Sequence, residues 1–164
     1  MEPTKRCVMV FDPGRTTGLA IAEPTGKGED GRWAFDILAC EDIEWDERFD
    51  IRPLLVKWQP TDIVIESFNL YPGAAAGQAK IRSDFPSIQV IGIILAYVNE
   101  LDLPEPIFQS PSTRKRAQIL AQHRDYTRGS PHKRDAYKHL RYYIVTNSKH
   151  WFKDLNDDEQ QPAT

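Results

Sequence analysis

Two apolar runs, residues 8–10 and 19–22, flank the stretch Phe11-Asp12-Pro13-Gly14-Arg15-Thr16-Thr17-Gly18-Leu19. An apolar run, a glycine-rich turn and a second apolar run predict a β-hairpin with strands over residues 6–12 and 17–23. Gly14 and Gly18 are expected to serve backbone geometry, Gly14 through a positive φ or a close approach to DNA. The first strand ends on Asp12. A buried carboxylate without a partner is costly, so an acid in this position indicates pairing with a cation or a metal ion.

Two further segments bring acidic side chains to positions where a metal site can form. Residues 61–66 are an apolar run that again ends on an acid, Glu66. Late in the chain, His132 and Asp135 lie three residues apart at the start of a helical pattern, so a helix presents both on one face. Two strand-end acids beside such a helix are typical of an oxygen-rich site for a divalent metal ion.

Together these motifs resemble the RuvC family of Holliday junction resolvases, which belongs to the RNase H-like (retroviral integrase) superfamily. The resemblance rests on the Asp-Pro-Gly-x-x-x-Gly hairpin, the strand-end Glu followed by an aromatic residue, and the His-x-x-Asp-Ala helix; it covers residues 6–147. It implies an RNase H-like α/β fold, a mixed five-stranded sheet whose first three strands are antiparallel, flanked by helices. It also implies a crossover junction endodeoxyribonuclease that acts on branched DNA as a homodimer.

A site of this type predicts phosphodiester hydrolysis with two Mg²⁺ ions in each active site, for which Mn²⁺ is expected to substitute. The expected catalytic and metal-binding residues are Asp12, Glu66, His132 and Asp135. In the resembling family the helix carries two metal-site side chains three residues apart, and this chain matches the variant with His before Asp. His139, one turn beyond Asp135, is expected to be only a neighbour of the site. The sequence shows no Ser-His-Asp or reactive-cysteine arrangement that would supply a nucleophile.

The remaining segments predict the element order βββαβαβαα, in which the strand–helix–strand unit implies a parallel pairing. In chain order they are a loop at 24–31, a strand at 32–39, helices at 47–58 and 87–101, a strand at 107–109, a helix opening at Ser110-Pro111, and a helix from Pro131 to about Asn147. One nuclease domain is expected over residues 1–152, followed by an acidic, disordered tail at 153–164.

Helical spacing predicts which side chains of two helices face inward. On the last helix they are Ala136, Leu140, Tyr143 and Ile144. On the helix at 87–101 they are Ile88, Ile91, Leu95, Val98 and Leu101. The resembling family forms its dimer on this second helix, and the same residues are equally compatible with an ordinary core.

Charge is unevenly distributed along a chain whose net charge is -3: residues 23–50 hold ten acids and three bases, and residues 109–150 hold ten bases and two acids. A basic face is typical of a nucleic-acid-binding protein, although a solvated helix surface carries the same charges. The side chains expected to contact DNA are Thr16, Phe68, Tyr71, Lys80, Arg114, Lys115, Arg116, Lys133 and Arg134. A hydrogen bond within its own turn is the alternative for Thr16, and core or dimer packing is the alternative for the two aromatic residues.

Composition argues against several other classes of protein. With 40% hydrophobic and 27% charged residues, the 164-residue chain has the balance of a globular domain. No apolar run reaches the roughly 18–20 residues that cross a membrane, and no signal peptide is expected before the first strand. Cys7 and Cys40 are too few for a disulfide framework or a zinc site, which suits a reducing compartment. We therefore expect a cytoplasmic protein, located in the bacterial host if a phage encodes it.

Two other functions fit parts of the sequence. A non-catalytic recombination protein that binds branched DNA needs the basic face but not the four site residues. The hairpin also resembles the first phosphate loop of actin-like ATPases and sugar kinases, but 164 residues leave no room for their second domain. We therefore expect no nucleotide cofactor.

Overall fold

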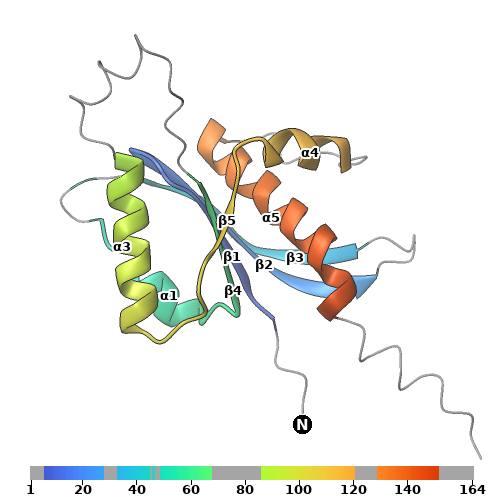
Figure 1. The fold of residues 1–164 in the computed structure, drawn as a ribbon, viewed down its shortest axis with the longest axis horizontal. Coiled ribbons are helices and arrows are strands. Elements are labelled where there is room, and N and C mark those ends of the chain that lie inside the picture. The colour runs from blue at the N-terminus through green and yellow to red at the C-terminus, as the bar shows by residue number, and fades with distance from the viewer. Residues whose placement is uncertain are drawn as a thin grey trace, which may run out of the picture.

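The fold is built on one mixed sheet of five strands in the order β3-β2-β1-β4-β5 (Figure 1). The computed structural model describes residues 6–27, 33–44, 46, 49–67, 86–120 and 129–151. The strands are β1 Val8–Asp12, β2 Thr16–Lys27, β3 Trp33–Glu44, β4 Asp62–Glu66 and β5 Ile107–Gln109. β1, β2 and β3 pair antiparallel, whereas β4 pairs in parallel with both β1 and β5. The predicted mixed sheet, with its antiparallel first three strands, is confirmed.

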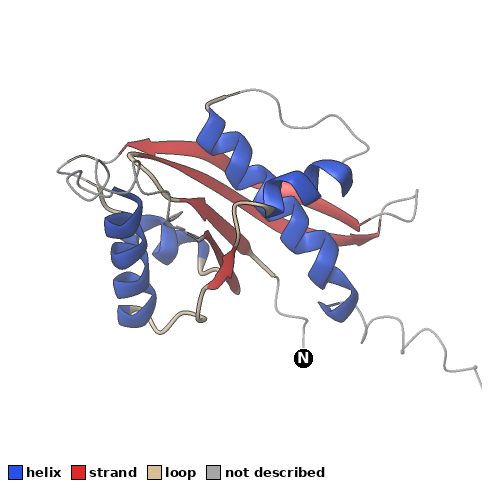
Figure 2. Cartoon of the chain, turned by 45° about the horizontal axis from the view of Figure 1, so that its top comes forward, coloured by secondary structure: helices blue, strands red, loops and turns tan. Residues whose placement is uncertain are grey.

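Helices cover both faces of this sheet (Figure 2). They are α1 Arg52–Trp58, α3 Pro86–Glu100, α4 Thr113–Leu120 and α5 Pro131–Trp151. α1 and α3 pack on one face, while α5 packs on the other and carries α4 against it. Within the ranges that the structure describes, no helix has the length and apolar character needed to cross a membrane.

β1 is buried on both of its faces, which explains why its apolar run is continuous rather than alternating. Met9 and Phe11 belong to the core under α1 and α3, whereas Val8 and Val10 belong to the core under α5. All four side chains are fully buried. The inward residues predicted for α5 are confirmed, since Ala136, Leu140, Tyr143 and Ile144 all lie in the second core. Burial of each large apolar side chain contributes about 1.5–3 kcal/mol.

The inward face of α3 differs from the predicted stripe. Val90, Ile94 and Val98 are buried at a spacing of four residues, whereas Ile88 and Leu95 are 46% and 38% exposed. Because the central part of α3, residues 90–98, carries no charged, amide or aliphatic hydroxyl side chain, several stripes were compatible with the helical period, and packing against the sheet selects one of them. The prediction that Ile88 and Leu95 face inward is therefore wrong.

β2 and β3 are longer than predicted. The segment expected to be a loop from residue 24 is strand as far as Lys27, and β3 continues to Glu44 instead of ending at residue 39. Two register shifts in the β2–β3 pairing, one of them between Pro24 and Gly26, carry the ladder past the proline. Such bulges are the usual way for a strand to accommodate a proline that cannot donate to its neighbour.

Three helix ends also differ from the sequence-based expectation, and one of them is the start of α4, which begins at Thr113 rather than at Ser110-Pro111. α1 begins at Arg52 rather than at residue 47, and the Asp50 carboxylate accepts a hydrogen bond of 2.9 Å from the backbone N–H of Arg52. At the other end of the chain, α5 continues beyond residue 147 to Trp151. Helix ends are the least specified feature of a helical pattern, because the terminal turns lack part of their hydrogen bonds.

The carboxyl ends of the parallel strands meet at one edge of the sheet. Phe11 pairs with Ile65, so the next residues along each strand, Asp12 and Glu66, are neighbours. Glu66 in turn pairs with Gln109 of β5. In open α/β sheets this edge is where ligands bind, since the loops that follow the strands diverge there.

Candidate active site

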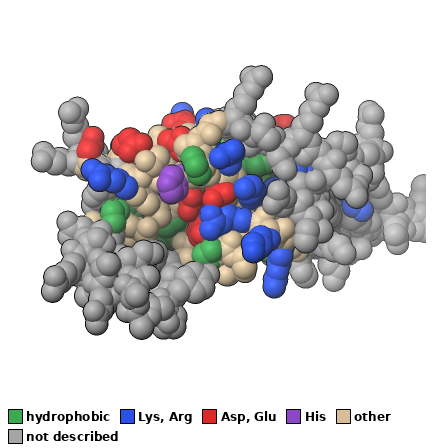
Figure 3. All heavy atoms as spheres, turned by 90° about the horizontal axis from the view of Figure 1, so that it is seen from above, with side chains coloured by type: hydrophobic (Ala, Val, Ile, Leu, Met, Phe, Trp, Pro, Cys, Tyr) green, Lys and Arg blue, Asp and Glu red, His purple; other side chains and the backbone are tan. Residues whose placement is uncertain are grey.

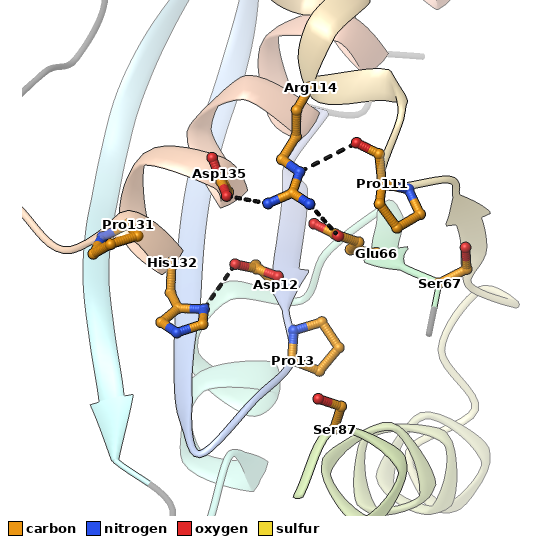
Figure 4. Close-up of a pocket in the computed structure, with 10 residues that line it drawn as sticks. All are labelled: Asp12, Pro13, Glu66, Ser67, Ser87, Pro111, Arg114, Pro131, His132 and Asp135. Atoms are coloured by element: carbon orange, nitrogen blue, oxygen red, sulfur yellow. Dashed lines mark hydrogen bonds and ion pairs between the residues drawn. The ribbon is translucent and has the colours of Figure 1, made fainter. Parts of the chain in front are cut away.

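A cavity of about 320 Å³ opens at the carboxyl ends of β1 and β4 (Figure 4). It is lined by Asp12, Pro13, Glu66, Ser67, Ser87, Pro111, Arg114, Pro131, His132 and Asp135. All four side chains predicted to form the metal site therefore face the same space. Asp12 and Glu66 are only 7% and 8% exposed, so their charges are largely withdrawn from water.

A glycine allows α5 to approach the sheet closely enough to complete this cavity. A β-carbon at Gly18 would lie 2.2 Å from the carbonyl oxygen of His132, which no side chain can do. Gly18 pairs with Asp12 across the hairpin, so the first turn of α5 lies directly over the end of β1. Gly14 does not have a positive φ, which was one of the two roles expected for it; among the described glycines, Gly26 and Gly129 do.

Ser130 fixes the first turn of α5. Its hydroxyl oxygen accepts a hydrogen bond of 3.1 Å from the backbone N–H of Lys133, which is the standard capping arrangement, and Pro131 occupies the first turn. The same hydroxyl donates to Asp42 of β3 at 2.5 Å. The end of the sheet and the start of the helix are thereby joined, and this contact sets the position of His132.

Asp12 carries the most perturbed carboxyl group of the site. Burial and the negative charge of Glu66 raise the pKa of Asp12 from 3.8 to about 7, and a hydrogen bond to His132 offsets part of the rise. His132 Nδ1 lies 3.0 Å from Asp12 Oδ2. At neutral pH the protein alone therefore does not fully stabilise the charge on Asp12.

Glu66 is held from two sides. His139 Nε2 lies 2.9 Å from Glu66 Oε2, and Arg114 Nη2 lies 3.4 Å from Glu66 Oε1. Burial tends to raise the pKa of Glu66, but the hydrogen bond and charge of His139, followed by the charge of Arg114, lower it overall. The expectation that His139 is only a neighbour of the site is wrong, because it is fully buried and bonded directly to the Glu66 carboxylate. The sequence did contain a signal for this role. His139 lies four residues after Asp135, on the same helix face, and it lies among the inward residues Ala136, Leu140 and Tyr143, which indicated that its side chain is buried.

Asp135 is neutralised by two cations. Its carboxylate pairs with the guanidinium of Arg114 and, at 3.0 Å, with Lys138 Nζ. Burial tends to raise the pKa of Asp135, but the hydrogen bonds and charges of Lys138 and Arg114 lower it below its ordinary value. Arg114 also donates from Nε to the carbonyl oxygen of Pro111 at 3.2 Å. Expected from the sequence as a DNA contact, Arg114 thus lies between Glu66 and Asp135 inside the cavity (Figure 4).

The donor chemistry of the cavity fits a divalent cation. Three carboxylates and an imidazole face it, and burial together with the nearby charge of Glu66 raises the pKa of Asp12, so a cation in the cavity would stabilise the charged form of that carboxyl group. As the described side chains stand, no three His, Cys, Asp or Glu groups converge on one point, because Arg114 lies among the acids. An ion would therefore replace the guanidinium as the partner of at least one carboxylate.

The other residues expected to contact DNA fall into three groups. Thr16 donates its hydroxyl to the Glu44 carboxylate at 2.9 Å; Thr17, rather than Thr16, bonds within the turn, to Gly14 O at 3.0 Å. Lys115 and Arg116 are exposed on α4, and Lys133 and Arg134 lie half-buried in the first turn of α5. Figure 3 shows acidic and basic side chains side by side on this part of the surface. Phe68, Tyr71 and Lys80 lie outside the described residues.

Comparison with known proteins identifies the fold. Thermus thermophilus RuvC, in complex with a Holliday junction substrate, matches with a TM-score of 0.63 and 14% identity over 89% of this chain and 97% of that chain. Fowlpox virus resolvase, in complex with Holliday junction DNA, matches with a TM-score of 0.57 and 14% identity over 85% of this chain and 99% of that chain. No family model and no curated protein matches the sequence. The chain therefore has the RuvC-like resolvase fold, as the hairpin, strand-end acid and helix motifs predicted.

Proposed function

We propose that this protein is a structure-selective endonuclease that resolves Holliday junctions by metal-dependent hydrolysis of phosphodiester bonds. The observation that carries the proposal is the convergence of Asp12, Glu66, His132 and Asp135 on one cavity at the carboxyl edge of β1 and β4. The fold that holds this cavity is shared with two proteins whose structures contain Holliday junctions.

Asp12, Glu66, His132 and Asp135 would hold two Mg²⁺ ions, or Mn²⁺ in their place. Ions in such a site orient the scissile phosphate, lower the pKa of the attacking water and stabilise the leaving oxygen. Water adds to phosphorus, the bond from phosphorus to the 3′ oxygen breaks, and a 3′ hydroxyl and a 5′ phosphate result. The carboxylates of the chain would supply the negative charge that retains the ions. Asp12 and Glu66 are buried, so bulk water screens their charges little.

The cations around the cavity would bind the DNA backbone. Lys115 and Arg116 on α4 and Lys133 and Arg134 on α5 extend from the helices that border the site, where they can neutralise phosphates without reading bases. The proposed DNA-binding set also includes Thr16, Phe68, Tyr71 and Lys80. When metal ions bind, the guanidinium of Arg114 would leave the carboxylates and pair with a phosphate of the DNA.

A homodimer fits this activity, because a Holliday junction has two-fold symmetry and two identical active sites can make paired nicks. The exposed apolar side chains of Ile88 and Leu95 on α3 support an interface on that helix. Light scattering should give the mass of two chains in solution or on the junction; a monomer in both states would contradict the dimer.

The second candidate is a protein that binds branched DNA without cutting it. One observation favours it. Arg114 already pairs with both Glu66 and Asp135, and a site that binds no metal ion needs such a cation to neutralise its carboxylates. The two functions are separated by incubating the protein with a labelled four-way junction and with a linear duplex of the same sequence, in Mg²⁺, Mn²⁺ or EDTA. We expect paired nicks in the junction alone, and only with a divalent ion. A bound but intact junction in both metal ions would establish the second candidate instead.

A further inference from the structure

His139 lies at the centre of a buried polar contact that the proposed chemistry does not use. It is fully buried on α5, one turn beyond Asp135, yet both nitrogens of its ring face oxygen atoms. Nε2 lies 2.9 Å from Glu66 Oε2, and Nδ1 lies 2.7 Å from Gln109 Oε1. Gln109 is itself only 8% exposed.

Three elements of the fold set this geometry. Glu66 and Gln109 are register partners on β4 and β5, so strand pairing fixes the separation of their backbones. The backbone N–H of Ser67 donates to Gln109 O at 2.7 Å, which extends the pairing one residue past the end of β4. The ring of His139 spans the two side chains, and with both nitrogens engaged it has one favourable orientation.

Packing alone does not explain a histidine in this position. Its neighbours along α5, Ala136, Leu140 and Tyr143, belong to the core under that helix, where a leucine or phenylalanine would fill the same space. Burying an imidazole costs free energy unless its nitrogens form hydrogen bonds. The hydrogen bonds to Glu66 and Gln109 therefore stabilise the buried ring of His139.

The consequence concerns the two oxygens of Glu66. His139 engages Oε2 in the interior, and Oε1 is left toward the cavity, where Arg114 Nη2 lies 3.4 Å away. We propose that His139 is a positioning residue that, held by Gln109, orients the Glu66 carboxylate so that Oε1 alone is offered to a cation in the cavity. This inference rests on the proposed function, because it names how one ligand of that same site is held.

Direct metal binding tests the proposal without relying on cleavage. The Mn²⁺ dissociation constant of the full chain is measured by titration calorimetry without DNA, at a temperature where circular dichroism shows each variant folded. His139→Phe keeps the ring volume but removes both hydrogen bonds, and we expect Mn²⁺ affinity to fall about 10- to 100-fold. His139→Gln keeps a donor for Glu66 and should recover most of this loss.

Gln109→Leu leaves the ring in place but removes its orienting partner, and it should weaken Mn²⁺ binding in the same direction. This variant also provides the test if His139→Phe does not fold. Leu140→Ala is the matched control, since it disturbs the next position of α5, in the apolar core under that helix, and removes no hydrogen bond to Glu66. Its Mn²⁺ affinity should equal that of the wild type.

The possible failures are distinguishable. If the wild-type chain binds no Mn²⁺, the proposed metal-dependent function fails, and this inference fails with it. If the wild type binds Mn²⁺ and folded His139→Phe or Gln109→Leu binds it equally well, the function stands and the positioning role is overturned. An equal loss of affinity in Leu140→Ala also overturns it, because the effect would then come from general destabilisation of α5.

Discussion

Gly18 of β2 lies so close to the backbone of His132 that a β-carbon would come within 2.2 Å of the carbonyl oxygen. Gly18→Ala should therefore push the first turn of α5 away from the sheet and move His132 from Asp12. We expect a loss of about 1–3 kcal/mol in the free energy of unfolding, which is typical of overpacking, together with loss of cleavage. Urea denaturation and a junction cleavage assay measure the two effects.

Gly92→Ala is the control for this substitution. Gly92 lies in the middle of α3 and is exposed to solvent, and a β-carbon there would meet no atom within 4 Å. It should stabilise the protein by about 0.5–1 kcal/mol, and it is a control for stability alone, because Gly92 shares the exposed face of α3 with the proposed interface residues Ile88 and Leu95. If Gly18→Ala behaves like Gly92→Ala, the close approach of α5 does not hold the site together.

The raised pKa of Asp12 predicts how stability depends on pH in the metal-free protein. A carboxyl group whose pKa is higher in the folded than in the unfolded state binds its proton more tightly when folded. The protonated carboxyl group of Asp12 therefore contributes to the free energy of unfolding. This contribution is complete below pH 3.8 and is lost as the pH rises to about 7. Asp12→Asn does not titrate. In EDTA it should become more stable than the wild type between pH 4 and pH 7, with a gain on the order of 2–4 kcal/mol above pH 7.

Chemical denaturation from pH 4 to pH 8.5 measures this gain, with exposed Glu105→Gln as the control variant. Saturating Mg²⁺ should reverse the order of stability, because the wild type gains the free energy of ion binding and Asp12→Asn does not. A difference between wild type and Asp12→Asn that stays constant over this pH range would contradict the electrostatic account of the cavity.

Arg114 offers a second test of the same electrostatics. Arg114→Ala leaves Glu66 and Asp135 without their shared guanidinium. In EDTA its thermal midpoint should fall by about 5 °C, and Mg²⁺ should restore most of that loss by supplying the missing positive charge. Arg52→Ala, which breaks a surface pair with Glu100, should shift the midpoint little and respond to Mg²⁺ as the wild type does. A similar Mg²⁺ response in both variants would show that Arg114 does not occupy the ion's place.

The cations that we propose to bind the DNA backbone predict a steep salt dependence of junction binding. Each phosphate contact contributes about -0.9 to the slope of log affinity against log salt concentration. Replacing both Lys115 and Arg116 with Ala should make that slope shallower by about 1.8 and weaken binding to all sequences alike. Lys57→Ala, exposed on α1, is the matched control. An unchanged slope in the double variant would mean that these α4 cations face only solvent.

The sequence predicted the parts of this molecule that strong local patterns specify. Strand-end acids placed Asp12 and Glu66 at one edge of a parallel pair, and the helical pattern that begins near Pro131 predicted the start of α5. Contacts between distant segments were not predictable in the same way. His139 and Arg114 are four and twenty-one residues from Asp135, and neither distance indicates which carboxylate each would meet.

Other misses have the same cause. The run of apolar residues through the centre of α3, residues 90–98, does not specify an inward face, so Ile88 and Leu95 were misplaced. The register shifts that lengthen β2 and β3 depend on pairing across the hairpin, which residue propensities do not encode. The roles predicted for Phe68, Tyr71 and Lys80, and for the tail at 153–164, concern residues outside the described ranges and stay predictions.

The most direct test of the central claim is the cleavage rate of a labelled four-way junction in Mg²⁺ by the wild type and by Asp12→Asn, Glu66→Gln and Asp135→Asn, with junction affinity measured in parallel. Each substitution should abolish cleavage while leaving affinity within a few-fold of wild type, because the cations that bind phosphates are unchanged. Exposed Glu105→Gln should cut as the wild type does. Near-normal cleavage by any of the three site variants would remove that residue from the site, and near-normal cleavage by all three would contradict the assignment of this cavity as the active site.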